Sequence, residues 1–160
     1  MSAITAVLAA RALLASLTPL KTACGRLCQG ACCRGDEATG MLLFPGEEAL
    51  YEGCAFARVV PTDFSLGGTP AQLLVCDGRC DRKNRPLACR LFPLFLKFKE
   101  DGITKLRIDV RAKSVCPLTD YGSKSLDPEF KQAARKAYDL LLKDETCAAY
   151  LQALDEAFSL

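Results

Sequence analysis

Four cysteines lie within ten residues in the stretch 24–33, and the last two of them, Cys32 and Cys33, are adjacent. A hydrophobic core gains nothing specific from thiols at this density. Soft thiolate ligands at short separations can instead close around one Zn²⁺ or an iron–sulfur cluster. Interspersed glycines let the backbone turn sharply enough to point several sulfurs inward. The stretch therefore predicts a metal-binding loop, with residues 76–89 as its counterpart.

The chain of 160 residues has ten cysteines and no histidine. Without histidine, the commonest nitrogen ligand of zinc and the usual general base are missing. All-sulfur sites remain, either Zn(Cys)₄ or an iron–sulfur cluster. A disulfide scaffold is the alternative, but it is typical of smaller secreted chains. We expect a cytoplasmic, reducing location, which favours metal over disulfides.

The apolar N-terminal residues 1–20 bear on this location. They have no basic start, and Arg11 interrupts them, so we interpret them as neither a signal peptide nor a membrane span. A signal anchor is the alternative. We expect a helix here, over residues 2–17, with Ile4, Val7, Leu8, Leu14 and Leu17 on one face.

Charge and length restrict the class of protein further. The 21 basic and 19 acidic residues leave a formal net charge of +2, too balanced to imply binding to nucleic acid or to a membrane. The length predicts a single domain, residues 1–160. Seven basic residues stand in or beside the cysteine stretches, and as a set we interpret them as compensation for thiolate charge: Arg26, Arg34, Arg79, Arg82, Lys83, Arg85 and Arg90.

The order and spacing of the cysteines resemble a known family. Cys24-xxx-Cys28-xxx-Cys32-Cys33 is followed by Cys76-xxx-Cys80, then by a stretch Arg-Pro-Leu-Ala-Cys-Arg-Leu-Phe-Pro around Cys89, then by Cys116. Over residues 24–117 this pattern is similar to the YkgJ-type cysteine-cluster family, described as zinc- or iron-chelating with eight characteristic cysteines. The spacing in the first block and residues 81–84 depart from the family pattern, but neither departure removes a cysteine.

The resemblance implies a set of eight thiolate ligands, arranged as two four-sulfur sites or one multinuclear cluster. They are Cys24, Cys28, Cys32, Cys33, Cys76, Cys80, Cys89 and Cys116. Cys54 and Cys147 match nothing in the motif, and we expect them to be buried apolar thiols. Cys147 stands near a predicted helix start, which makes it the better candidate for a reactive thiol.

The function expected from these residues is metal binding, with zinc preferred and iron or an iron–sulfur cluster as the alternative. A structural zinc module would present a surface to another protein. An iron–sulfur protein would instead carry out redox or group-transfer chemistry, and a storage or transfer protein would exchange its metal. Arg85 and Arg90 either bind an anionic substrate or neutralise thiolates and tie loops to backbone carbonyls, and we favour the second role.

The expected fold is a small, irregular, metal-centred α+β domain. Residues 41–44 and 72–75 are predicted strands, and the second of these delivers Cys76 to the centre. A short helix is expected at 47–52, where Glu47 and Glu48 complement the helix dipole. Residues 53–70 are predicted to be a loop, and residues 85–90 one or two turns of helix ending before Pro93.

The C-terminal half carries clearer patterns. Residues 94–100 and 103–110 alternate apolar and polar side chains around Asp101-Gly102, which predicts a β-hairpin with Leu96 and Phe98 facing Leu106 and Ile108. Asp127 and Pro128 predict the start of a helix over residues 128–143. A last helix is expected at 146–158, so that residues 127–160 form a helical hairpin.

Overall fold

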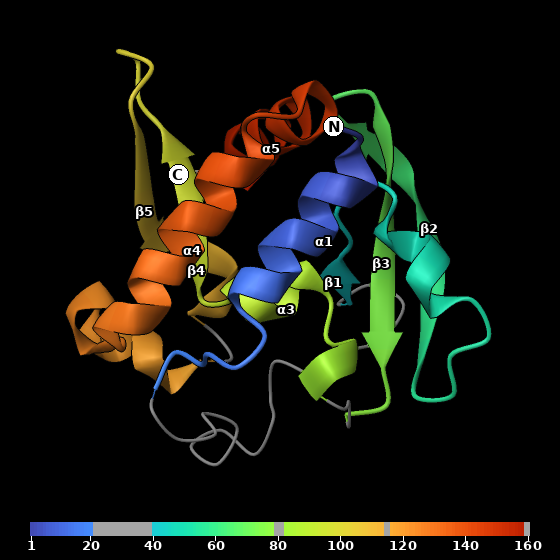
Figure 1. Cartoon of the computed structure of the whole chain (residues 1–160), viewed down its shortest axis with the longest axis horizontal. Coiled ribbons are helices and arrows are strands. Elements are labelled where there is room, and N and C mark those ends of the chain that lie inside the picture. The colour runs from blue at the N-terminus through green and yellow to red at the C-terminus, as the bar shows by residue number, and fades with distance from the viewer. Residues whose placement is uncertain (21–39, 79–81, 114–115, 159–160) are drawn as a thin grey trace.

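The computed structural model describes residues 1–20, 40–78, 82–113 and 116–158. These residues form an α+β fold with two antiparallel sheets, as expected. In Figure 1 the three-stranded sheet lies on the right and a two-stranded hairpin on the left, with helices packed between and across them. The predicted loop positions 24, 28, 32, 33 and 80 fall outside the described residues.

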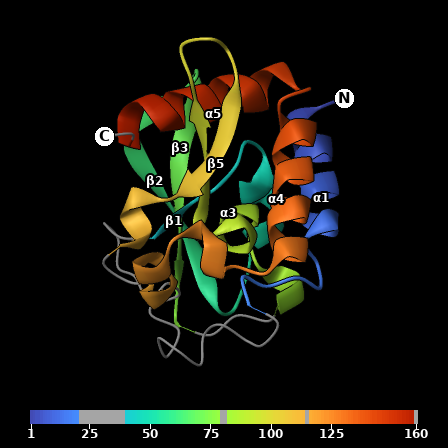
Figure 2. The ribbon, with the colours of Figure 1, turned by 90° about the vertical axis from the view of Figure 1, so that its left-hand side faces the viewer.

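The first helix, α1 (Ala3–Leu13), begins at Ser2, whose side chain accepts a hydrogen bond from the backbone N–H of Thr5. Its buried face consists of Ala6, Val7 and Ala10. The prediction that Leu8 shares this face is wrong, because Leu8 is 45% exposed. Small alanine side chains let α1 lie close along α4 (Pro128–Leu141), and Figures 1 and 2 both show the two helices side by side.

The two C-terminal helices form where predicted. Asp127 caps α4 by accepting a hydrogen bond from the N–H of Glu129, and α5 (Glu145–Phe158) follows after a short connection. The predicted helical hairpin is wrong, because α4 packs mainly along α1 whereas α5 packs against β2 (Ala57–Leu66), β4 (Leu94–Phe98) and α1. The predicted apolar face of α4 is buried throughout: Phe130, Ala134, Ala137, Tyr138 and Leu141.

The three-stranded sheet has the order β1-β3-β2, with β1 at Met41–Leu42, β2 at Ala57–Leu66 and β3 at Thr69–Cys76. The predicted loop over 53–70 is wrong, because most of it is the edge strand β2. Pro61 is tolerated there because an edge strand can lack a ladder donor, and the pairing register shifts between Pro61 and Ser65. Gly67 and Gly68, both at positive φ, make the turn to β3.

The hairpin of β4 (Leu94–Phe98) and β5 (Thr104–Ile108) is confirmed. Leu96 pairs with Leu106 as expected, whereas Phe98 pairs with Thr104 and Ile108 with Leu94. Between the two sheets lies the short helix α3 (Leu87–Leu91), preceded by the 3₁₀ turn η3 (Arg82–Asn84). The predicted helical turn at 85–90 is therefore confirmed, with Pro86 as its N-cap.

Four further 3₁₀ turns complete the described chain. They are η2 (Glu47–Tyr51), η4 (Val110–Ala112), η5 (Pro117–Tyr121) and η6 (Ser123–Ser125). A large apolar core joins the helices to both sheets, and a small second cluster consists of Leu43, Tyr51 and Leu74. No helix in the described parts of the chain has the length and hydropathy needed to cross a membrane.

Candidate metal centre

Three of the eight predicted ligands lie on described elements. Cys76 is the last residue of β3, Cys89 is in α3, and Cys116 immediately precedes η5. All three are half-buried. The other five, Cys24, Cys28, Cys32, Cys33 and Cys80, are outside the described residues. The prediction of a strand that leads to Cys76 is confirmed, whereas its delivery to a metal centre stays a prediction.

The described residues on either side of the first cysteine stretch are 19–20 and Gly40. Each border contacts a part of the chain that is close in sequence to a predicted ligand. Met41 pairs with Leu74, so Gly40 lies against the half of β3 that ends at Cys76, and a Cβ on Gly40 would lie 2.7 Å from the Leu74 carbonyl oxygen. At the other border, the Pro19 carbonyl accepts a hydrogen bond from the N–H of Asp127 at 2.8 Å. Asp127 closes the segment of 3₁₀ turns that begins after Cys116.

These borders gather at one end of the molecule. The C-terminal ends of α1 and β3 lie at the lower end in Figure 1, with α3 and the 3₁₀ turn η3 between them. The end of β3, which carries Cys76, and α3, which carries Cys89, therefore lie toward the same end of the fold (Figure 1).

Tyr51 lies among three described cysteines. Its ring belongs to the small cluster against which Cys54 and Cys76 pack, and its hydroxyl interacts electrostatically with Cys89. The hydroxyl donates a hydrogen bond to the Asn84 carbonyl at 2.8 Å. Burial, reinforced by the charge of Glu47, raises the pKa of Tyr51, so the phenol stays neutral and remains a donor.

Glu47 fixes the position of the helix that carries Cys89. Its carboxylate is fully buried and accepts hydrogen bonds from the N–H of Leu87 at 2.7 Å and from Arg11 at 3.0 Å. A third hydrogen bond comes from the N–H of Phe44 at 3.2 Å. Burial raises the pKa of Glu47, while the Leu87 N–H, the Arg11 charge and the Phe44 N–H oppose that rise.

Glu47 therefore does more than complement a helix dipole. That prediction is incomplete, because the carboxylate joins α1, η2 and the start of α3 through one buried group. Its partners lie 36 and 40 residues away in sequence, and the local pattern around Glu47 gave no sign of them. Only the apolar neighbours Leu43, Phe44 and Leu50 hinted that this acidic residue could be buried.

Arg90 ties together the backbone that precedes α3. Its guanidinium donates hydrogen bonds to the carbonyls of Arg82, Lys83 and Arg85 at 3.2, 3.0 and 2.9 Å. A longer bond of 3.4 Å reaches the carbonyl of Arg11 at the end of α1. The prediction that Arg90 ties loops to carbonyls is confirmed. Burial lowers the pKa of Arg90, and the neighbouring charge of Arg11 lowers it further.

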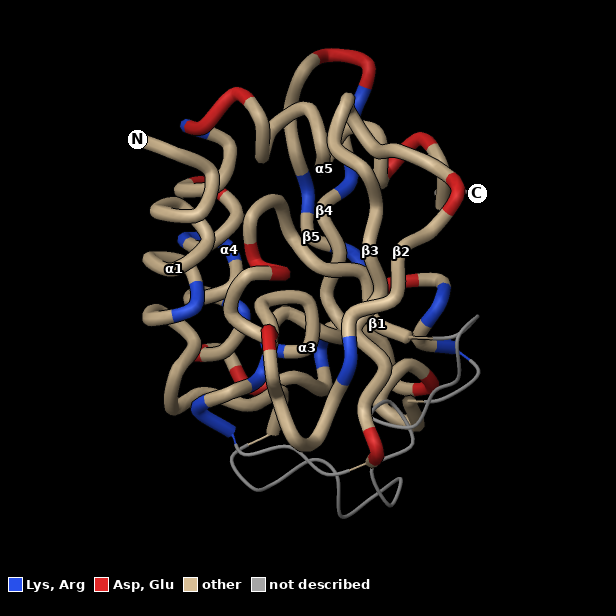
Figure 3. The backbone as a smooth tube through the Cα atoms, turned by 90° about the vertical axis from the view of Figure 1, so that its right-hand side faces the viewer, with Lys and Arg blue, Asp and Glu red and all other residues tan. Residues whose placement is uncertain are grey.

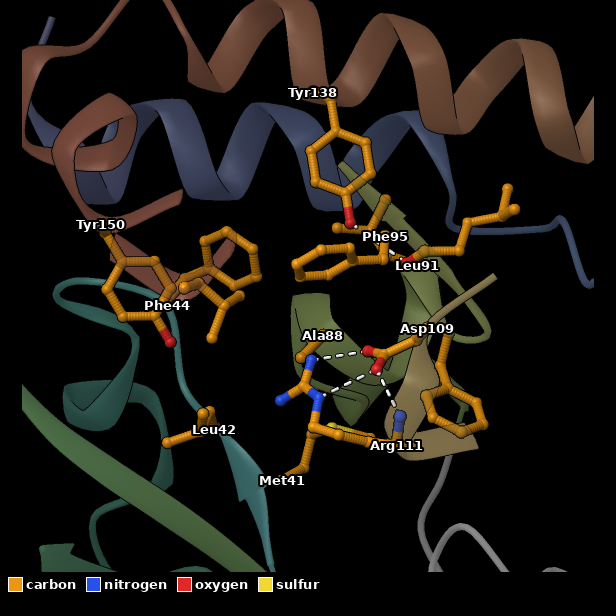
Figure 4. Close-up of a pocket in the computed structure, with 13 residues that line it drawn as sticks. Met41, Leu42, Phe44, Ala88, Leu91, Phe95, Asp109, Arg111, Tyr138 and Tyr150 are labelled. Atoms are coloured by element: carbon orange, nitrogen blue, oxygen red, sulfur yellow. Dashed lines mark hydrogen bonds and ion pairs between the residues drawn. The ribbon is translucent and has the colours of Figure 1, made fainter. Parts of the chain in front are cut away.

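A second ion pair holds the segment before Cys116. Figure 4 shows Arg111 making two contacts from its guanidinium to the buried carboxylate of Asp109, one of them at 2.6 Å, beside a small cavity behind α3. The Arg111 guanidinium also lies 4.7 Å from the centre of the Phe158 ring. The N–H of Cys116 then donates to the carbonyl of Ala112 at 2.8 Å. The cavity itself, about 20 Å³, has room for one water.

The two cysteines outside the motif differ from the expectation. Cys147 is fully buried, as predicted, and its burial argues against the reactive thiol that its place near a helix start suggested. Burial, together with a hydrogen bond that the thiol donates to the Asp144 carboxylate, raises the pKa of Cys147 to about 12. Cys54 is only half-buried and lines a shallow depression with Glu48 and Arg58, so the prediction of a buried thiol is wrong there.

Among the residues that the structure describes, no three side chains of Cys, Asp or Glu are grouped closely enough to hold a metal ion. Cys76, Cys89 and Cys116 therefore cannot form a site by themselves, and a site built on them needs ligands from the other five positions. No family model, curated protein or solved structure matches this chain.

Proposed function

We propose that this chain is a metal-binding protein that holds zinc through its cysteine thiolates, and that the metal is structural. The ligands are the eight cysteines of the motif, as in the YkgJ-type family that the spacing resembles. The observation that carries the proposal is that β3, which ends at Cys76, and α3, which carries Cys89, lie toward the same end of the fold (Figure 1). Thiolates are the only soft ligands that the chain can supply in number.

The surroundings of the described cysteines support a rigid site. Glu47 and Arg90 fix α3 from both ends, and the Asp109–Arg111 pair holds the segment before Cys116. Outer partners of this kind orient metal ligands and are costly to lose. A Zn(Cys)₄ centre carries a formal charge of −2, and Arg90 directly follows Cys89 in α3. A neighbouring positive group favours the thiolate form of cysteine.

A structural site of this kind contributes folding free energy directly. The metal would close the loops at one end of the apolar core, and the folded domain would then present its surface to another protein. No general base of the histidine type is available for hydrolytic chemistry. A redox role would require iron in place of zinc, because Zn²⁺ has no redox chemistry.

The experiment is elemental analysis of protein purified without oxygen and without added metal. We expect about two zinc ions per chain and no visible absorption. Cys89→Ser removes a proposed ligand and should lower the zinc content of the purified protein. Cys147→Ala is the matched control, because it removes a cysteine that is buried away from the proposed site, and its zinc content should equal that of the wild type.

The result separates the alternatives. If the purified protein is brown and contains iron and acid-labile sulfide, the chain is an iron–sulfur protein and the structural zinc role is wrong. Full metal content in Cys89→Ser would contradict the ligand assignment. Cys54→Ser should leave the metal content unchanged, and a loss there would add Cys54, which packs against the same apolar cluster as Cys76, to the ligand set.

A further inference from the structure

A basic depression lies beside the proposed metal centre, between the C-terminal half of α1 and the segment 82–90. Its volume is about 530 Å³. Its apolar lining is formed by Leu8, Ala12 and Ala15, from α1 and the turn that follows it. Its polar lining is formed by four basic side chains, Arg11 from α1 and Arg82, Lys83 and Arg90 from the facing segment. Figure 3 shows Lys and Arg positions gathered below the C-terminal end of α1.

The positive charge of this polar lining is only partly compensated. Glu47 is fully buried and pairs with Arg11 at 3.0 Å. Within the described part of the chain, no carboxylate forms an ion pair with the side chain of Arg82 or Lys83, and both residues are exposed. Among the residues that the structure describes, one carboxylate thus faces four cations. Such an excess at one depression costs free energy unless an anion shares the space.

The positions of the four cations define where an anion would bind. Arg90 is held by carbonyls and contributes mainly charge, whereas Arg82 and Lys83 extend from the adjoining turn η3. Arg11 uses one terminal nitrogen of its guanidinium for Glu47 and Tyr51. The remaining N–H groups of Arg11 join the guanidinium of Arg82 and the ammonium of Lys83 as hydrogen-bond donors. Such a set is suited to phosphate oxygens.

We infer that this depression binds a small organic phosphate monoester. The dianionic phosphate lies against Arg11, Arg82 and Lys83, and the organic group lies against Leu8, Ala12 and Ala15. A carboxylate would leave more of the positive charge uncompensated, and inorganic phosphate would leave the apolar lining exposed. This site is separate from the proposed thiolate centre, because none of its lining residues is a cysteine.

The test is calorimetric titration of the full-length protein, with its metal as purified, with phenyl phosphate and with inorganic phosphate. We expect phenyl phosphate to bind more tightly than inorganic phosphate. The double variant Arg82→Gln, Lys83→Gln should weaken phenyl phosphate binding at least tenfold. The matched control is Lys105→Gln with Arg107→Gln, which removes the same charge from the exposed side of β5 and should change the affinity less than twofold.

A second variant tests the apolar lining. Leu8 is 45% exposed, so Leu8→Asn is compatible with folding. It should weaken phenyl phosphate and leave inorganic phosphate unchanged. No measurable binding of phenyl phosphate to the wild type, or equal losses in the two double variants, would overturn the proposal. The metal content of every variant is measured as well. If phenyl phosphate binding is lost only in variants that have also lost metal, the basic residues belong to the thiolate centre, and the proposal of a separate site is overturned.

Discussion

The backbone N–H of Leu87 donates a hydrogen bond to the buried carboxylate of Glu47 across 2.7 Å. Leu87 is the first residue of α3, where backbone N–H groups have no partner within the helix. Glu47 supplies that partner and also holds Arg11 of α1. Two segments 40 residues apart are thereby fixed to each other, and the helix that carries Cys89 has a defined position.

Glu47→Ala should lower the free energy of unfolding by about 3 kcal/mol, because it leaves Arg11 without its carboxylate and two backbone N–H groups without acceptors. Urea unfolding measures the change. The control is Glu48→Ala, whose side chain is only half-buried, and it should change the free energy of unfolding by less than about 0.5 kcal/mol. Equal effects of the two substitutions would contradict the role assigned to Glu47.

Arg90→Lys should loosen the segment that leads into α3. A lysine ammonium cannot span the carbonyls of Arg82, Lys83 and Arg85 as a guanidinium does. We expect a loss of about 2 kcal/mol in the free energy of unfolding. The variant should also release its metal faster to a chelator, followed with a zinc-sensitive dye. Arg107→Lys is the control, and a release rate in Arg90→Lys no faster than that of the control would contradict the account.

Tyr138 makes the stability depend on alkaline pH. Burial raises the pKa of Tyr138 above the value of 10.0 expected for the unfolded chain. The folded state therefore keeps the phenolic proton at pH values where the unfolded state loses it. The resulting contribution to stability is complete below about pH 10 and is lost as the pH rises further.

Tyr138→Phe should therefore reduce the fall in the free energy of unfolding above about pH 10. At neutral pH the same substitution should cost about 1 kcal/mol, because the Leu94 carbonyl loses its hydrogen bond. Tyr121→Phe serves as the control, since Tyr121 is 74% exposed. Urea unfolding at neutral and alkaline pH measures both effects. An unchanged alkaline profile in Tyr138→Phe would show that this phenol is ionised in the folded protein.

Cys147 should resist alkylation in the folded protein. Its thiol is fully buried, donates toward the Ala3 carbonyl and has a pKa of about 12. Iodoacetamide at pH 8, followed by mass spectrometry of peptides, should modify the half-buried Cys54 and leave Cys147 intact. Both should react once the chain is unfolded. Rapid labelling of Cys147 in the folded state would show that this residue is the reactive thiol that its place near a helix start predicted.

The elements predicted correctly from the sequence are those whose signals are local. Asp127 and Pro128 marked the start of α4, and the alternation around Asp101-Gly102 marked the β4–β5 hairpin. The strand β2 was missed because Pro61 and the Gly67–Gly68 pair suggested a loop. Pro61 is tolerated because β2 is an edge strand, and the two glycines form the turn of a hairpin. The sequence of β2 alone shows neither its edge position nor its pairing with β3.

The candidate site was predicted only in part, for a similar reason. The helical turn with Cys89, the strand ending at Cys76 and the carbonyl contacts of Arg90 followed from short patterns. The role of Glu47 did not, because its burial depends on α1 and α3 packing over it. Which cysteines lie near one another is also a property of the packed chain rather than of local spacing.

The most direct test of the central claim is X-ray absorption at the metal edge of the protein purified without added metal. The account predicts a zinc edge and a first shell made only of sulfur, at about 2.3 Å, because the chain has no histidine and offers thiolates in number. A first shell of oxygen or nitrogen, or protein that folds fully with no metal bound, would contradict it.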